Sequence, residues 1–339
     1  MGDPSLADHF AAMDPPLRPG DWTIHDPSRV VSVGGVQMVA ATARAQEDGY
    51  GCGLETWVRP GPDASWQPGA CLLTQKPAWI DEVFQDQEGA FWAPAFLDEN
   101  TLFYAVSDGL DRDGATCLGL ARAHGTGPER VWRDGGQPVT CSPGDTPVGE
   151  GAPEAIDPAA LTAPDGNRYL VFGGGVVVLV RINDHGLPVA LDRPDGAGAD
   201  PVVLARAPAG PENGETWIEA PFLHYRDGFF YLFVNVFDCC QAADSRYEIH
   251  VGRSNRVVGP YLTKDGLRLD EGHATPLMPQ SGPRIGPGQA GIWSDDQGTD
   301  WLTFHYYDEN REGLPWIGER RIAWRDGWPE IVPDPAQQY

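Results

Sequence analysis

One pattern of polar and apolar positions recurs along this chain. Its clearest copy starts at Glu219, which is followed by two apolar runs, residues 220–225 and 229–234, joined by Asp227-Gly228. An Asp-Gly pair between runs of β-branched and aromatic residues predicts a tight β-hairpin turn. A carboxylate at the start of so apolar a hairpin contributes little to packing, so we expect Glu219 to act as a catalytic acid.

Four other segments repeat this order of a polar residue, a proline or glycine, an apolar strand, a turn and a second apolar strand. They cover residues 25–41, 91–106, 155–172 and 285–306. When the five copies are aligned on Pro27, Pro94, Pro158, Pro221 and Gly288, the intervals are 67, 64, 63 and 67 residues. A repeat of that length has room for two more strands. Residues 247–253, with alternating side chains and the polar ones outward, are predicted to form one of them.

The constant spacing predicts an all-β fold, a five-bladed β-propeller in which five modules of four strands form a ring. We expect residues 21–339 to form this single domain. An N-terminal extension at residues 1–20 would precede it, with at most a short helix around Pro4 to Met13. Two β-sandwiches, the alternative, would not give one period across the whole chain.

The first strand of each module should line the central channel, so the residues just before the repeated proline should meet at one mouth. These residues are Asp26, Trp92, Asp157, Glu219 and Gly286, which would bring three carboxylates together. Asp-Pro alone indicates little, because it occurs six times in the chain and serves mostly in turns. The alternative is that the three acids only cap the strand starts by accepting backbone hydrogen bonds.

Convergent carboxylates suit the hydrolysis of a glycosidic bond. One acid protonates the departing oxygen, and an ionised carboxylate about 6.5–9.5 Å away activates a water molecule in an inverting reaction. A third carboxylate raises the pKa of the acid, because like charges resist joint ionisation. Three carboxylates could instead bind a metal ion, but the chain contains no calcium loop of alternating acids, so this use ranks second.

Charge and composition exclude other classes of partner. A formal net charge of −25 argues against nucleic acid and anionic membranes, since both need basic patches. No apolar run reaches the 18 residues of a membrane span. The six cysteines include no CxxC pair and are expected to be buried free thiols. The N-terminus is not an intact signal peptide, so the protein is expected in the cytoplasm, or secreted or periplasmic if a leader has been removed.

Seven short motifs match those of one enzyme family. They are Ile24-His25-Asp26-Pro27, Phe91-Trp92-Ala93-Pro94, Ala155-Ile156-Asp157-Pro158, Ile218-Glu219-Ala220-Pro221, Phe237-Asp238-Cys239-Cys240, Gly259-Pro260-Tyr261 and Ile285-Gly286-Pro287-Gly288. On these motifs the chain resembles glycoside hydrolase family 43, whose members are five-bladed propellers, and within it the α-L-arabinanases. The resemblance extends in order over roughly residues 22–331.

The resemblance implies an inverting glycoside hydrolase that cleaves α-L-arabinofuranosyl linkages in 1,5-α-L-arabinan or arabino-oligosaccharides, acting as a monomer. Asp26 would be the general base, Asp157 would set the pKa of the acid and orient it, and Glu219 would be the general acid. An exo-acting α-L-arabinofuranosidase or β-xylosidase of the same family is the alternative. A non-catalytic carbohydrate-binding propeller is an alternative of another class, and it would be expected to lack one of the three carboxylates.

The resemblance also implies binding residues. It places His25, Trp92 and Phe237 near the sugar. His305 matches the family's channel histidine, which lies beside a bound ion, often calcium, that the chemistry itself does not require. The alternative for His305 is a packed core residue, and Trp92 could equally be a core aromatic.

Three positions depart from the arabinanase motifs. Ala95 stands where an aspartate is usual, Gln289 stands where Gly-Pro-Gly is usually followed by histidine, and Gly173-Gly174-Gly175 replaces a segment that bears serine and tryptophan. All three should lie near the cleft. The expected hydrolytic residues are therefore present, while the walls that select the substrate differ.

Overall fold

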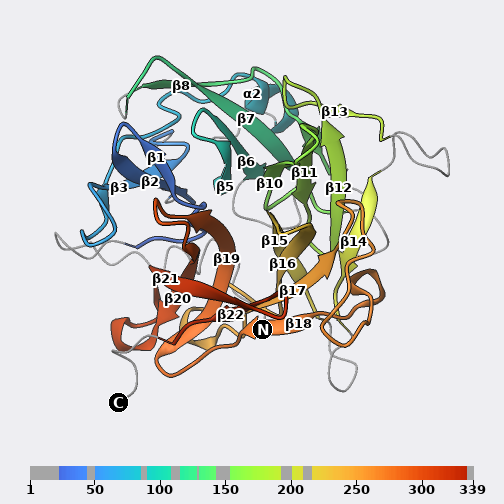
Figure 1. Cartoon of the computed structure of the whole chain (residues 1–339). Coiled ribbons are helices and arrows are strands. Elements are labelled where there is room, and N and C mark those ends of the chain that lie inside the picture. The colour runs from blue at the N-terminus through green and yellow to red at the C-terminus, as the bar shows by residue number, and fades with distance from the viewer. Residues whose placement is uncertain are drawn as a thin grey trace, which may run out of the picture.

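The computed structural model describes residues 23–43, 50–84, 90–107, 115–127, 130–142, 153–191, 201–208 and 216–333. In this part of the chain five antiparallel sheets form a ring around a central channel, which confirms the predicted five-bladed β-propeller (Figure 1). The predicted N-terminal extension and its helix around Pro4 to Met13 lie outside the described residues. Among the described residues, no helix has the length and apolar character needed to cross a membrane.

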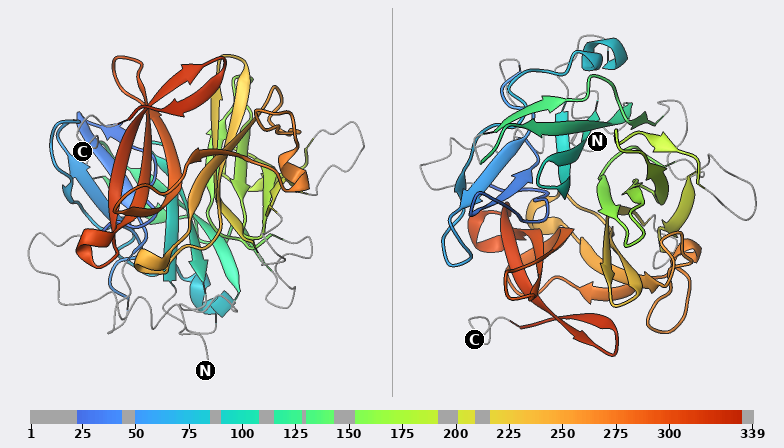
Figure 2. Two further views of the ribbon diagram at one scale, coloured as in Figure 1. Left: turned by 90° about the horizontal axis from the view of Figure 1, so that it is seen from below. Right: turned by 45° about the horizontal axis from the view of Figure 1, so that its top comes forward.

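The blades follow one another round the ring in chain order, and each takes its strands from one continuous stretch (Figure 2). Blade 1 contains β1 (Val31–Val33), β2 (Val36–Ala41), β3 (Glu55–Arg59) and β4 (Gln67–Pro68). Blade 2 contains β5 (Ala90–Asp98), β6 (Thr101–Ser107), β7 (Thr116–His124), β8 (Val131–Asp134) and β9 (Thr140–Cys141). Blade 3 contains β10 (Ala159–Thr162), β11 (Arg168–Phe172), β12 (Val176–Ile182), β13 (Pro188–Val189) and β14 (Val202–Arg206).

Blade 4 contains β15 (Ile218–Arg226), β16 (Phe229–Val236), β17 (Glu248–Ser254) and β18 (Thr275–Met278). Blade 5 contains β19 (Arg284–Ser294), β20 (Asp300–Asp308), β21 (Leu314–Arg325) and β22 (Trp328–Ile331). The described helices are short: α2 (Trp79–Phe84), η2 (Ala242–Asp244), η3 (Leu269–Glu271) and η4 (Glu309–Arg311).

The predicted hairpins form the inner two strands of every blade. In blade 4, Asp227-Gly228 joins β15 to β16 with both residues at positive φ, the backbone that this kind of turn requires. The predicted third strand is β17, but its alternation of buried and exposed side chains is absent. His250 and Gly252 are buried like their neighbours, because other parts of the fold cover both faces of the strand.

Each innermost segment carries a non-glycine residue with a left-handed backbone where it reaches the channel mouth. These residues are Asp26, Ala93, Asp157, Ala220 and Gln289, with φ between 44° and 57°. A left-handed backbone conformation costs a non-glycine residue about 1–2 kcal/mol. Contacts with the surrounding structure must therefore hold these five residues in that conformation. In β5, β15 and β19 the residue lies at a register shift, which re-aims the neighbouring side chains.

Four of these residues donate their backbone N–H to a side chain of the preceding blade. Asp26 donates to His305 Nδ1 (3.2 Å), Ala93 to Thr42 Oγ1 (3.0 Å), Ala220 to Asp157 Oδ2 (2.9 Å) and Gln289 to Asn235 Oδ1 (3.1 Å). The left-handed residues are therefore also the points at which neighbouring blades are joined.

This shared geometry corrects two details of the predicted register. Gln289, and not Gly286, takes the fifth position, because two register shifts in β19 displace the repeat in that blade. Glu219 lies one residue before the left-handed position, which Asp26 and Asp157 themselves occupy. Glu219 therefore lies within the bulged strand β15, whereas Asp26 and Asp157 lie before the first strands of their blades, β1 and β10.

The expectation of free thiols is wrong. All six cysteines are paired, as Cys52–Cys71, Cys117–Cys141 and Cys239–Cys240. Cys117 and Cys141 face each other across β7 and β9, a pairing that depends on strand register and not on spacing along the chain. The first two bridges each lie within one blade, and the third joins consecutive residues.

Apolar side chains and one ion pair close the ring between blades 5 and 1. Ile24, Trp57, Trp293 and Ile317 belong to one buried cluster that spans this junction. Beside it, Arg59 donates two hydrogen bonds to the Glu319 carboxylate, at 2.6 and 2.8 Å. Arg59 is only 5% exposed, so the Glu319 carboxylate compensates for the burial of its positive charge.

We predict that Glu319→Ala destabilises the propeller by about 3–5 kcal/mol, because it leaves the Arg59 guanidinium buried without its anion. Chemical denaturation followed by tryptophan fluorescence measures the change. The matched control is Glu330→Ala, which removes an exposed partner of Arg325 and should cost less than about 1 kcal/mol. Equal effects of the two substitutions would show that the ring does not depend on this ion pair.

Candidate active site

The left-handed residues and their neighbours surround a pocket at one mouth of the channel. It is lined by His25, Asp26, Thr42, Trp92, Glu154, Ile156, Asp157, Glu219, Cys239, Cys240 and Tyr247. The structure therefore brings together the three predicted catalytic carboxylates with His25 and Trp92. Phe237 is not among the lining residues, and its ring packs edge-on against His250 with 6.2 Å between centroids.

Asp26 lies in a cluster of hydrogen-bond donors. Its Oδ2 atom accepts a hydrogen bond from Thr42 Oγ1 at 2.6 Å and lies 2.7 Å from His25 Nδ1, while Oδ1 lies 3.3 Å from His305 Nδ1. Burial raises the pKa of Asp26, but the charge and hydrogen bond of His25 and those of His305 together hold it well below its ordinary value. Asp26 is therefore an ionised carboxylate at neutral pH.

The two histidines beside Asp26 stack on each other, with ring centroids 4.1 Å apart. Burial, with the nearby charge of His25, lowers the pKa of His305 to about 4, although Asp26 opposes the shift. His305 is therefore neutral at neutral pH. His305 lies next to Asp26 and is not among the residues that line the pocket.

Glu219 has a different set of neighbours. Trp217 Nε1 donates to its Oε2 at 2.5 Å, and the Tyr247 hydroxyl donates to its Oε1 at 2.7 Å. Burial, followed by the charges of Glu219 and Asp157, raises the pKa of Tyr247 well above 10, so this hydroxyl keeps its proton. Asp157 fixes the backbone next to Glu219, since its Oδ2 accepts from Ala220 N–H.

In the fifth blade a glycine leaves room for the ring of Tyr247, which donates to Glu219. Gly288 lies one residue before left-handed Gln289, the register that Glu219 occupies in blade 4. A Cβ atom on Gly288 would lie 2.4 Å from the Tyr247 ring. Glycine at this position therefore lets Tyr247 reach Glu219. Among the carboxylates of the pocket, Asp26 and Glu219 have contrasting hydrogen-bond partners, which is the requirement for a paired acid and base.

Comparison with known proteins identifies the family. A sequence model described as glycosyl hydrolases family 43 matches residues 64–329. The chain belongs to this family. It is accordingly a glycoside hydrolase, as the resemblance of its motifs predicted.

Family 43 relatives match over most of their length. The extracellular endo-α-(1→5)-L-arabinanase 1 of Bacillus subtilis (strain 168) is 28% identical over 312 residues, 90% of this chain and 87% of that protein. An extracellular exo-α-(1→5)-L-arabinofuranosidase of Cellvibrio japonicus (strain Ueda107) is 27% identical over 287 residues, 79% and 77% of the two proteins. The solved structure of a family 43 endo-arabinanase from Bacillus licheniformis is 27% identical, covers 92% and 98% of the two chains, and has a TM-score of 0.71.

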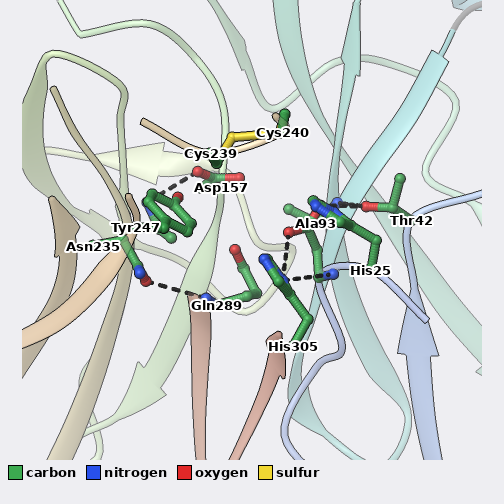
Figure 3. A network of polar contacts seen from close by, with 12 residues as sticks. His25, Thr42, Ala93, Asp157, Asn235, Cys239, Cys240, Tyr247, Gln289 and His305 are labelled. Carbon is green, nitrogen blue, oxygen red and sulfur yellow. Dashed lines mark hydrogen bonds and ion pairs between the residues drawn. A yellow bond between two sulfur atoms is a disulfide. The ribbon is translucent and has the colours of Figure 1, made fainter. Parts of the chain in front are cut away.

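The departures from the family motifs have visible structural consequences. A Cβ atom on Gly174 would lie 2.7 Å from Glu154 Oε2 and 2.9 Å from the Trp217 ring. Glycine here thus lets Glu154, a fourth carboxylate, approach the pocket. Ala95 is buried in the apolar core, and Gln289 is buried below the pocket near His305 (Figure 3).

Several pocket residues escaped the sequence analysis. Thr42 and Glu154 were not singled out, Tyr247 was noted only as part of the predicted strand 247–253, and Ile156, Cys239 and Cys240 were noted only as motif residues. Thr42 follows β2, just as His305 and Asn235 lie near the ends of β20 and β16, and all three accept from left-handed residues. An alignment of the second strands of the repeat would have identified Thr42.

The expected channel ion can be tested against the residues present. His25, Asp26 and His305 offer ligand atoms within 4.8 Å of one another. His305 Nε2 is buried and has no hydrogen-bond partner among the described residues. Calcium takes about six to eight oxygen ligands. Two imidazoles and one carboxylate fit it only if water supplies most of the remaining ligands.

We predict that Thr42→Val destabilises the enzyme by about 1–3 kcal/mol, because the buried Ala93 N–H loses its acceptor and Asp26 loses a donor. Thr42→Ser, which keeps the hydroxyl, is the matched control and should cost less. Urea unfolding of the three proteins gives both differences. If valine is tolerated as well as serine, the hydroxyl does not hold the two blades together.

Proposed function

We propose that this family 43 enzyme hydrolyses α-L-arabinofuranosyl linkages with inversion, and that 1,5-α-L-arabinan or its oligosaccharides are the substrates. The observation that carries the proposal is the pairing, in one pocket, of ionised Asp26 with buried Glu219 beside Asp157. The names of the arabinan-cleaving relatives support the substrate class.

Asp26 is proposed as the general base. Its Oδ2 atom is engaged by His25 and Thr42, whereas Oδ1 has only the longer contact with His305. Oδ1 is thus the oxygen that can accept a proton from water. That water attacks the anomeric carbon on the face opposite the leaving group, and its proton passes to Asp26 as the carbon–oxygen bond forms.

Glu219 is proposed as the general acid, which gives its proton to the departing glycosidic oxygen. Asp157 would orient the acid by accepting the backbone N–H of the neighbouring Ala220. The hydrogen bonds from Trp217 and Tyr247 to Glu219 stabilise the carboxylate that remains after proton transfer. In this proposal Glu219 supplies the proton, Asp26 accepts one, and Asp157 assists Glu219.

The alternatives differ mainly in how the substrate is bound. Relatives with endo and exo names match at nearly the same identity, so an exo-acting α-L-arabinofuranosidase or β-xylosidase is the second candidate. A non-catalytic sugar-binding propeller is disfavoured because all three carboxylates line the pocket. We expect a monomer, since one chain supplies every residue of the proposed mechanism. The three disulfides suit an oxidising compartment.

We also propose a channel ion, calcium or another, held beside His305 through water, because neutral His305 accepts from Asp26 N–H at Nδ1 and so carries its proton on Nε2. The support is that this buried nitrogen lacks a partner among the described residues. When bound, such an ion would supply positive charge that favours the ionised form of Asp26. Calorimetric titration of calcium into the enzyme and into His305→Asn tests the site. Equal heats from the two proteins would exclude it.

We predict that Asp26→Asn and Glu219→Gln each lower kcat on arabinan by about 10²–10⁴-fold while circular dichroism remains unchanged. Glu219→Gln should regain activity on a nitrophenyl arabinofuranoside, because that leaving group departs without a proton, and Asp26→Asn should not. Glu248→Gln, which contacts His250 and does not line the pocket, is the control. Proton NMR should detect the β-anomer first, and an initial α-anomer would contradict inversion.

We predict faster release of reducing ends from debranched arabinan than from nitrophenyl β-xyloside. Chromatography of early products separates the modes of action, since endo cleavage gives a range of oligosaccharides and exo cleavage gives one short product. Higher activity on the xyloside would favour the second candidate. Absence of activity on arabinan, arabino-oligosaccharides and the nitrophenyl arabinofuranoside would disprove the proposed substrate class.

A further inference from the structure

A disulfide between consecutive residues lines the pocket. Cys239 and Cys240 are bonded to each other and are only partly buried. Such a bridge closes no long loop, so it removes little entropy from the unfolded chain and cannot stabilise the fold in the usual way. Its effects must be local. It fixes the peptide between the two cysteines, and it presents a sulfur surface to the pocket (Figure 3).

The peptide of this disulfide is linked to Tyr307. The Cys240 N–H donates to the Tyr307 hydroxyl oxygen at 2.9 Å, and that oxygen lies 2.7 Å from His25 Nε2. Tyr307 is fully buried, and its hydroxyl has one proton to donate. The oxygen accepts from Cys240, and we assign its single proton to His25 Nε2, the arrangement that leaves the His25 ring proton on Nδ1 beside Asp26.

The placement of the Tyr307 hydroxyl proton determines the tautomer of His25. If Nε2 accepts from Tyr307, the ring proton lies on Nδ1, 2.7 Å from Asp26 Oδ2. One chain of donors then runs from Cys240 through Tyr307 and His25 to the carboxylate of Asp26. Each bond in such a chain polarises the next. The orientation of Asp26 is therefore tied to a peptide in the opposite wall of the pocket.

We propose that the Cys239–Cys240 disulfide contacts the apolar face of a bound furanose and, through Tyr307 and His25, positions the carboxylate of Asp26. This inference rests on the proposed function for the role of Asp26 as base. Sulfur is polarisable and a weak acceptor, so the bridge is suited to the C–H face of a sugar and not to its hydroxyl groups. Tyr307 and His25 act as positioning residues in this arrangement.

The claim that the disulfide positions Asp26 through Tyr307 and His25 is tested without substrate, by two-bond proton–nitrogen NMR of the histidine side chains. His25→Gln assigns the signal of His25. We expect the Nδ1–H tautomer in the wild type and its loss, or a mixture of tautomers, in Tyr307→Phe and in Cys239→Ser/Cys240→Ser. An Nε2–H tautomer in the wild type would overturn this half, and so would a signal that neither variant changes.

The claim that the disulfide contacts the bound furanose is tested by steady-state kinetics on arabino-oligosaccharides. Cys239→Ser/Cys240→Ser should raise KM about tenfold, the discrimination that one methylene-sized contact gives. Cys52→Ser/Cys71→Ser removes a bridge whose residues are absent from the pocket lining and should leave KM unchanged. Mild reduction of the wild type should reproduce the increase, and the same treatment of Cys239→Ser/Cys240→Ser should add nothing. An unchanged KM in folded Cys239→Ser/Cys240→Ser or in the reduced wild type would overturn the contact.

The two halves separate this inference from the proposed function. If the wild type cleaves no arabino-oligosaccharide, the proposed function fails, and the NMR measurement still decides whether the disulfide positions His25. If the wild type cleaves them and the variants match it in both KM and His25 tautomer, only the role of the disulfide fails.

Discussion

The site depends on backbone that ordinary strands avoid. Asp26, Ala93, Asp157, Ala220 and Gln289 each take a left-handed conformation where an inner strand meets the channel. In four of them the N–H, turned out of the sheet, is accepted by a side chain of the preceding blade. The same bond therefore offsets local strain and sets the distance between blades. Function and assembly rest on one set of contacts.

This constraint explains how one repeat supplies different chemistry. The position before the left-handed residue carries His25, Trp92, Ile156 and Glu219 in the first four blades, and all four side chains line the pocket. In the fifth blade Gly288 leaves the space to Tyr247. The same backbone position thus presents a histidine, a tryptophan, an isoleucine, a glutamate and a glycine, so the pocket is asymmetric although the ring is nearly regular.

Much of the fold could be predicted from the sequence, because the repeat is set by local signals. Proline, the Asp-Gly turn and the apolar runs of residues 220–225 and 229–234 act over a few positions, and they located the hairpins and the carboxylates. The misses concern non-local geometry. Register shifts moved the fifth position from Gly286 to Gln289, and strand pairing brought together cysteines that their spacing does not relate.

The positions of the site residues could be predicted where they follow the register of the sequence repeat. Asp26, Asp157 and Glu219 were found because they precede or adjoin the repeated proline. Phe237 was placed near the sugar by motif alone, and its ring packs against His250 outside the lining. Tyr307 and Trp217 could not be recognised, since their roles depend on hydrogen bonds to His25 and Glu219 that only the folded ring creates.

The junction between blades 5 and 1 determines whether the chain termini could be moved to another junction. Within the described residues no strand is shared across it, and side chains such as Arg59 and Glu319 hold it together. It therefore resembles the other four junctions, at which the chain happens to continue. The order of the blades in space, and not the point at which the polypeptide is opened, determines the pocket, so a circularly permuted chain would retain every contact of the active site.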